Sequence, residues 1–171
     1  MAAKPRRAKD LFTRAKNMKI ALKYGLLITA VVVAWVVIVR FVFGVGTDSK
    51  ANMIAPILFN LTAIVAIALG MRARKQELGG NLFFKEGLKT GMSISLAYAV
   101  SACLFFMLQY LVAGPQLLMT EAEAETGPLW RIAVFAYAGL FFGSLVFGLI
   151  YSTIIAFFIA KRLGRQDSEI I

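Results

Sequence analysis

Four apolar stretches separated by shorter polar segments dominate the pattern of this 171-residue chain. Each is long enough for a helix to cross a hydrocarbon core of about 30 Å, which takes about 20 mainly apolar residues. Their approximate bounds are 22–44, 52–71, 91–113 and 130–160. The pattern predicts an all-α, polytopic membrane protein of four transmembrane helices arranged as two helical hairpins. This transmembrane domain would cover 20–163, between a basic segment over 1–19 and a tail over 164–171.

Composition supports a membrane location. Hydrophobic residues make up 60% of the chain and charged residues only 16%, with a mean hydropathy of +0.76. Soluble domains carry about 25% charged residues. The chain contains no His and one Cys, Cys103. Zinc sites, His-based acid–base catalysis and an internal disulfide are therefore not expected, and we predict no cofactor and no catalytic or metal-binding residues.

The basic residues fall mainly on one side of the predicted spans. The N-terminal segment through Lys23, the middle loop and the C-terminal tail together hold sixteen of the nineteen Lys and Arg residues. Such a bias predicts that both termini and the middle loop lie in the cytoplasm, as in a multi-pass protein of the bacterial inner membrane. The net charge of +10 is therefore interpreted as an orienting signal, and no nucleic-acid partner is expected. The loop 114–130, which carries Glu121, Glu123 and Glu125, would lie outside.

The first 19 residues have the pattern of a basic amphipathic helix. Leu11, Phe12, Ala15 and Met18 share one helical face, and basic residues occupy the others. Such helices lie on anionic membrane surfaces. The residues expected to face the anionic inner leaflet or a partner protein are Arg6, Arg7, Lys9, Arg14 and Lys16.

Small residues recur every four positions on the third and fourth predicted spans. Because apolar burial provides little drive between helices in lipid, small residues that let backbones approach mark helix contacts. We therefore predict contacts between these two spans, with a second contact, within the chain or to another protein, at the Gly139–Gly143 pair. The residues assigned to helix packing are Gly91, Ser95, Ala99, Gly139, Gly143, Ser144, Gly148 and Ser152.

Two pairs of segments also suggest a tandem repeat. Residues 21–29 match 87–95 at Leu, Lys, Gly and Ile, and 61–76 aligns without gaps on 151–166. A duplicated helical hairpin would relate the two halves by a pseudo-twofold axis along the membrane normal. Chance matching among apolar residues is the alternative.

Ionisable groups are nearly absent from the span interiors, which leaves uncharged polar residues as the candidates for a site. Asn60, Tyr98 and Gln109 form the candidate polar intramembrane site, and Tyr137 and Tyr151 are weaker candidates. Hydrogen bonds between helices are the alternative role for all of them.

Short motifs at the helix entries resemble a known family. These are Ala21-Leu22-Lys23-Tyr24-Gly25, the run Phe84-Lys85-Glu86-Gly87-Leu88-Lys89-Thr90-Gly91 after Gly79-Gly80, and the ending Ala160-Lys161-Arg162. Over about residues 18–163 the chain resembles the bacterial membrane family called domain of unknown function 4199. The resemblance implies a four-helix membrane protein and supplies no catalytic residues.

Three classes of function are compatible with these features. We favour a non-catalytic accessory or scaffold subunit of a larger inner-membrane complex, whose partners would be membrane lipids and other membrane subunits or further copies of itself. The alternative is a small oligomeric transporter or channel for a small solute. A lipid-modifying enzyme is the third, for which the sequence offers no nucleophile beside a base.

Overall fold

The computed structural model describes residues 5–39, 50–113 and 129–160. The helices are α1 (Pro5–Val37), α2 (Lys50–Glu77), α3 (Phe84–Ala113) and α5 (Leu129–Ile159), and the described residues form no strand. Each helix contains a segment long and apolar enough to cross a membrane. These segments are Ala15–Val37, Ile54–Glu77, Phe84–Val112 and Ala133–Ile159. The predicted all-α fold with four spans is confirmed.

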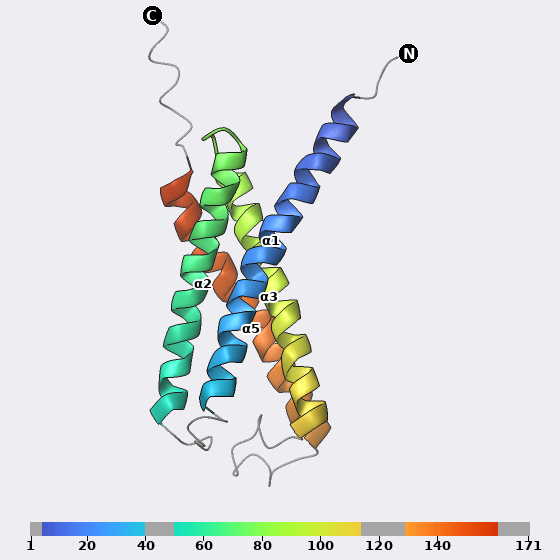
Figure 1. Ribbon diagram of the computed structural model, residues 1–171, viewed down its shortest axis with the longest axis vertical. Helices are drawn as coiled ribbons and strands as arrows, with labels where there is room; N and C mark the ends of the chain where they lie inside the picture. Colours follow the sequence, from blue (N-terminus) through green and yellow to red (C-terminus); the bar gives the residue numbers. More distant parts are fainter. Residues whose placement is uncertain (1–4, 40–49, 114–128, 161–171) are drawn as a thin grey trace, which may run out of the picture.

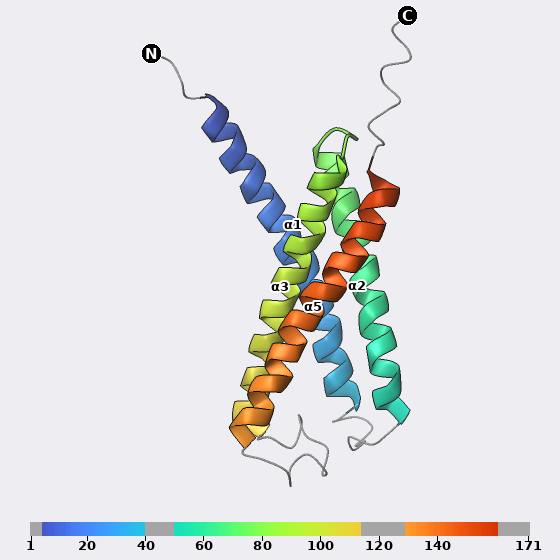
Figure 2. The same cartoon turned by 180° about the vertical axis from the view of Figure 1, so that it is seen from behind.

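The four helices form a bundle in which α1, α2, α5 and α3 follow one another around the axis. α1 packs on α2 and α3, α5 packs on α3 and α2, and α3 also contacts α2. The start of α1, the α2–α3 turn and the end of α5 all lie at one end of the bundle, called here the turn end (Figure 1). At the opposite end, called here the splayed end, α1 and α2 lie apart from α3 and α5 (Figure 2).

The helices differ from the predicted spans mainly at the turn end. The boundary expected at residue 19 does not interrupt α1, which is one helix from Pro5 to Val37 and leans away from the other helices at its N-terminal end (Figure 1). α3 begins at Phe84, seven residues before the predicted start, and α2 continues to Glu77. Polar and basic residues continue these helices beyond their apolar spans, because an α-helix is held by backbone hydrogen bonds and does not require apolar side chains. The predicted end of the first span at 44, the loop 114–128 and the tail 164–171 lie outside the described residues.

The turn between α2 and α3 ends α2 by a glycine motif. Gly79 and Gly80 have φ values of 68° and 89°, a region that favours glycine. The Gly80 N–H donates to the Lys75 carbonyl at 2.9 Å, and the Gly79 N–H donates to the Gln76 carbonyl at 3.1 Å. This pair of hydrogen bonds is the Schellman arrangement, which satisfies carbonyls at a helix end. The turn therefore reverses the chain within a few residues.

Small residues hold α3 and α5 together in the half of the bundle nearer the turn. Gly148 lies in contact with Ser95, and Gly91 lies in contact with Ser152. One turn further on, a methyl group at Gly87 would meet the Ala156 Cβ at 3.2 Å. Each step of four residues along α3 thus matches a step of four along α5 in the opposite direction. Close backbone approach of this kind is how helices gain packing energy in lipid.

A second close contact joins α1 to α3. A methyl group at Gly25 would lie 2.7 Å from the Ala97 Cβ and 3.0 Å from the Ile94 carbonyl oxygen. Further along, the hydroxyls of Thr29 and Ser101 are hydrogen-bonded at 2.6 Å. The two helices therefore touch at backbone level, with a polar link beside the contact.

Gly25 and Gly91, which the proposed repeat pairs with each other, have different neighbours. Gly25 packs on α3, whereas the nearest neighbours of Gly91 are Ser152 on α5 and Met71 on α2. A twofold relation between the hairpins would instead direct Gly91 toward α1. The repeat stays a hypothesis from the sequence, and this pair of contacts does not follow it.

Candidate binding cleft between α2 and α5

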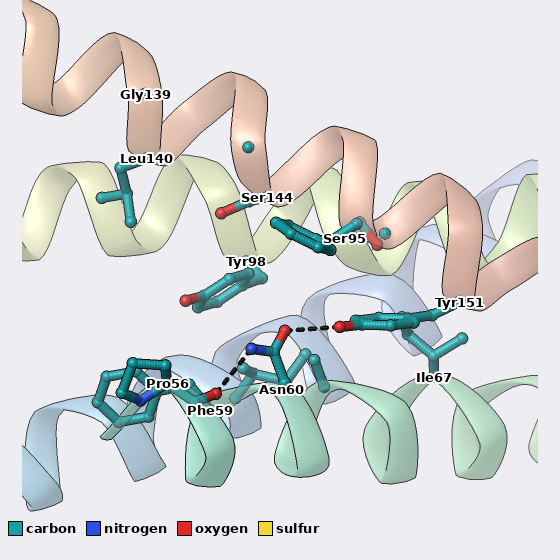
Figure 3. A pocket seen from close by; sticks show the side chains of 15 residues that line it. Pro56, Phe59, Asn60, Ile67, Ser95, Tyr98, Gly139, Leu140, Ser144 and Tyr151 are labelled. Atoms are coloured by element: carbon teal, nitrogen blue, oxygen red, sulfur yellow. Dashed lines mark hydrogen bonds between the residues drawn. The ribbon is translucent and has the colours of Figure 1, made fainter. Parts of the chain in front are cut away.

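A cavity of about 290 Å³ lies between α2 and α5, with α3 behind it (Figure 3). It begins where the close α3–α5 packing ends, since Ser95 and Gly148 contribute to both features. From there it continues along α2 as far as Pro56 and along α5 as far as Gly139, toward the splayed end. Its lining residues are Ile28, Pro56, Phe59, Asn60, Ala63, Ile67, Ser95, Tyr98, Gly139, Leu140, Gly143, Ser144, Phe147, Gly148 and Tyr151.

Asn60 is the polar centre of this cleft. The Tyr151 hydroxyl donates to Asn60 Oδ1 at 2.7 Å, and Asn60 Nδ2 donates to the Pro56 carbonyl at 2.7 Å. The first bond crosses from α5 to α2, and both are drawn in Figure 3. An amide group can donate two hydrogen bonds and accept two. These two bonds use one N–H and one oxygen lone pair, so a second N–H and a second lone pair can bind another group.

Tyr98 adds a second polar group from α3. Its ring lies between α5 and α2 with the hydroxyl in the space between them (Figure 3), and its side chain interacts with Ser144. Ser95, which also lines the cleft, donates to the Gly91 carbonyl at 3.1 Å. The cleft is thus apolar over most of its surface. Its polar groups are the amide of Asn60 and the hydroxyls of Ser95, Tyr98, Ser144 and Tyr151.

The structure brings two of the three predicted polar residues together. Asn60 and Tyr98 both line the cleft, whereas Gln109 is half-buried on α3 nearer the splayed end and does not line it. Tyr151, which the sequence marks only as a weaker candidate, proves to be the partner of Asn60. An i, i+4 pattern cannot show that link, because the two residues lie on different helices and 91 positions apart.

The residues assigned to helix packing divide into two groups. Gly91, Ser95, Gly148 and Ser152 lie in the contacts between α3 and α5, and Ala99 is fully buried. Three others line the cleft: Gly139, Gly143 and Ser144. A methyl group added at either of these two glycines would meet nothing within 4 Å. Within the described part of the chain no second contact forms at these glycines, and a contact to another protein stays a prediction.

Two further polar contacts join α3 and α5 beyond the cleft. The Tyr137 hydroxyl donates to the Phe106 carbonyl at 3.1 Å, and Cys103 Sγ lies 4.0 Å from the Tyr137 carbonyl oxygen. Cys103 is half-buried and forms no disulfide. Tyr137 therefore has a packing role between these helices.

The predicted basic residues lie at the turn end. Arg6, Arg7, Lys9 and Arg14 belong to the first part of α1, and their side chains are outside the described set. Lys16 is exposed. Lys75 has a specific role, since its Nζ donates to the Ile159 carbonyl at 2.9 Å at the C-terminal end of α5. Arg74 is buried and paired with Glu77 at 2.9 Å. The acidic loop with Glu121, Glu123 and Glu125 lies outside the described residues.

Comparison with known families gives one match. A family model described as protein of unknown function (DUF4199) matches residues 23–126, more than half of the chain. The chain belongs to this family. The match includes α2, α3 and most of the membrane-spanning part of α1, and it ends before α5, so it is shorter than the resemblance over 18–163 expected from the motifs. No curated protein and no solved structure matches the chain.

Proposed function

We propose that this DUF4199 protein is a non-catalytic accessory or scaffold subunit of a larger complex in the bacterial inner membrane. The observation that carries the proposal is the uneven packing of α3 and α5. The cleft is bounded at its turn-end side by Ser95 and Gly148, and beyond them Gly91 is packed against Ser152 and Met71. A cleft that ends on close-packed helices suits binding better than passage through the bundle.

The chemistry of the cleft supports the same proposal. Its hydroxyl groups belong to Ser95, Tyr98, Ser144 and Tyr151, and none of its fifteen lining residues is a carboxylate, a lysine or a histidine that could act as their base. Nucleophilic catalysis by a hydroxyl needs such a base within hydrogen-bond reach. We therefore assign this site a binding role.

Native mass spectrometry of the tagged protein, extracted gently from its own membrane at natural expression level, tests this function. The expected result is a reproducible complex of fixed stoichiometry with other membrane subunits. Recovery only as a monomer or a closed homo-oligomer contradicts the proposal. A parallel extraction of an unrelated four-span protein carrying the same tag identifies proteins that adhere without specificity.

A small oligomeric transporter is the second candidate, and one observation favours it. At the splayed end the α1–α2 pair separates from the α3–α5 pair, and the cleft with Asn60 and Tyr98 lies where α2 and α5 diverge (Figures 2 and 3). Transport would require the half near the turn to open as well. Under this function Asn60→Leu abolishes uptake by proteoliposomes and leaves assembly intact.

We further propose that the turn end faces the cytoplasm. Lys16 and Lys19, in the first half of α1, and Lys85 and Lys89, in the first two turns of α3, are exposed, and both helices begin at this end, where these residues would face anionic headgroups.

Labelling with a membrane-impermeant maleimide checks this orientation in a Cys103→Ala background. A cysteine introduced by Asn81→Cys in the α2–α3 turn should react only after the cells are permeabilised, because the reagent cannot reach the cytoplasm. Val112→Cys, near the splayed end, serves as the matched control and should react in intact cells. Reaction at position 81 in intact cells would reverse the orientation.

A further inference from the structure

We propose that the cleft between α2 and α5 binds a neutral, membrane-soluble molecule that carries a hydrogen-bond-accepting oxygen on an apolar body. The inference goes beyond the accessory role, since it assigns a ligand site that is independent of the partner's identity. Its basis is the combination of space, polar groups and absence of charge within one cavity.

The space comes from two glycines. Gly139 and Gly143 belong to the α5 wall, and nothing lies within 4 Å of the point where a methyl group would stand on either. The volume of about 290 Å³ equals roughly ten times the share of one molecule in liquid water, so it holds roughly ten non-hydrogen atoms. This is enough for one substituted ring or a short length of chain, and too little for a helix about 10 Å across.

The polar groups select an acceptor. Asn60 Nδ2 has a second N–H beside the one that it donates to Pro56. The Tyr98 hydroxyl lies in the space between α2 and α5. Both can donate to a carbonyl, ester or hydroxyl oxygen. A lipid chain without such an oxygen would leave the second Asn60 N–H without an acceptor, which is costly where water is scarce.

The absence of charge selects a neutral ligand. None of the fifteen lining residues carries a charge at neutral pH, and the cleft lies within the membrane-spanning segments of all four helices. An ionised headgroup without a counter-charge is unfavourable at such a position. The aromatic rings of Phe59, Phe147 and the two tyrosines provide flat apolar surface around the polar groups.

Native mass spectrometry of the purified full chain, with added probes of equal tail length, tests the inference. Decylubiquinone presents a ring carbonyl, methyl decanoate presents a chain ester, and sodium decanoate presents a charged group. We expect one bound copy of a neutral probe and at least tenfold weaker binding of decanoate. Preference between the two neutral probes tells a ring-bearing lipid from a chain ester. Equal binding of decanoate would overturn the proposal.

Variants locate the probe in the cleft. Gly143→Leu fills open space and should reduce binding at least tenfold, because its side chain occupies the cavity. Val146→Leu adds bulk to the same helix at an exposed position outside the lining and should bind as the wild type does. Tyr98→Phe removes one donor and should weaken binding by about three- to tenfold.

The outcome does not depend on a single variant. Should Gly143→Leu fail to fold, Gly139→Leu and Tyr98→Phe give the same test at separate points of the wall. Wild-type binding by these folded variants would overturn the proposal. Failure of all neutral probes, together with loss of a native complex in Gly143→Leu, would assign the cleft to a partner protein and also overturn it. The accessory function would survive that result, so the two proposals fail separately.

Discussion

Gly148 and Gly143 lie on the same helix, little more than one turn apart, and have opposite surroundings. Gly148 is buried in contact with Ser95, whereas a methyl group at Gly143 would meet nothing within 4 Å. The first lets two helices touch, and the second helps to form a cavity. Small residues at regular spacing in a membrane helix therefore show only where side-chain volume is low. Either a neighbouring helix or an open cavity can lie beside them.

The largest effect should come from adding one methyl group to a closely packed glycine, Gly91, and comparing it with one added to the open Gly143. At Gly91, a methyl group would lie 2.6 Å from the Ser152 Cβ, an atom fixed to the α5 backbone. Gly91→Ala should therefore lower the free energy of unfolding by about 1–3 kcal/mol. Gly143→Ala should raise it by up to about 1 kcal/mol, because alanine favours a helix. Thermal unfolding in detergent measures both, and equal shifts would refute the distinction between the two halves.

An intermediate effect is expected at the hydrogen bond that crosses the cleft. Tyr151→Phe removes the donor to Asn60 Oδ1 while keeping the ring. Hydrogen bonds between membrane helices contribute about 0.6 kcal/mol on average and at most about 1.7 kcal/mol in measured cycles, so a loss in this range is expected.

A double-mutant cycle with Asn60→Leu measures the coupling itself. The two changes should not be additive, because either one alone removes the bond. Additive losses would show that Tyr151 and Asn60 act separately, and the cleft would then lack its cross-link.

The smallest effect should come from the turn end. Lys75→Met removes the hydrogen bond from Nζ to the Ile159 carbonyl and the favourable placement of a cation at the end of α5. Such charges contribute about 0.3–1 kcal/mol at exposed helix ends. Hydrogen exchange should become faster over the last turn of α5 and stay unchanged near Gly148. Unchanged exchange at the α5 end would show that this contact contributes nothing.

The architecture was largely predictable from the sequence, because a span needs only length and apolar composition. The spans, the absence of strands among the described residues and the contact of Gly91 and Ser95 with α5 all follow local patterns. The unbroken α1 was not predictable by the same route, since the charged residues that suggested a separate segment are compatible with one continuous helix.

The cleft was only half predictable. Asn60 and Tyr98 stand out as polar residues within apolar spans, so composition identifies them. Their meeting with Tyr151, and the exclusion of Gln109, depend on how α2, α3 and α5 cross. That crossing is fixed by glycine contacts such as Gly91 against Ser152. The sequence alone shows these contacts only as small residues at every fourth position, without their partners. Gly139 and Gly143 belong to the same pattern and form the wall of a cavity instead.

The unbroken α1 has a mechanical consequence. Its 33 residues make a rod of about 50 Å, well beyond the hydrocarbon thickness of about 30 Å. The rod contacts α3 at three levels: the Thr90 hydroxyl donates to Asn17 Oδ1 at 2.9 Å, Gly25 packs against Ala97, and the hydroxyls of Thr29 and Ser101 are hydrogen-bonded. A helix held at three successive levels does not pivot about one of them, so α1 and α3 should move as one body. Spin-label distances between α1 and α3, measured with and without a binder on the N-terminal end of α1, should therefore stay constant, and a change would refute this coupling.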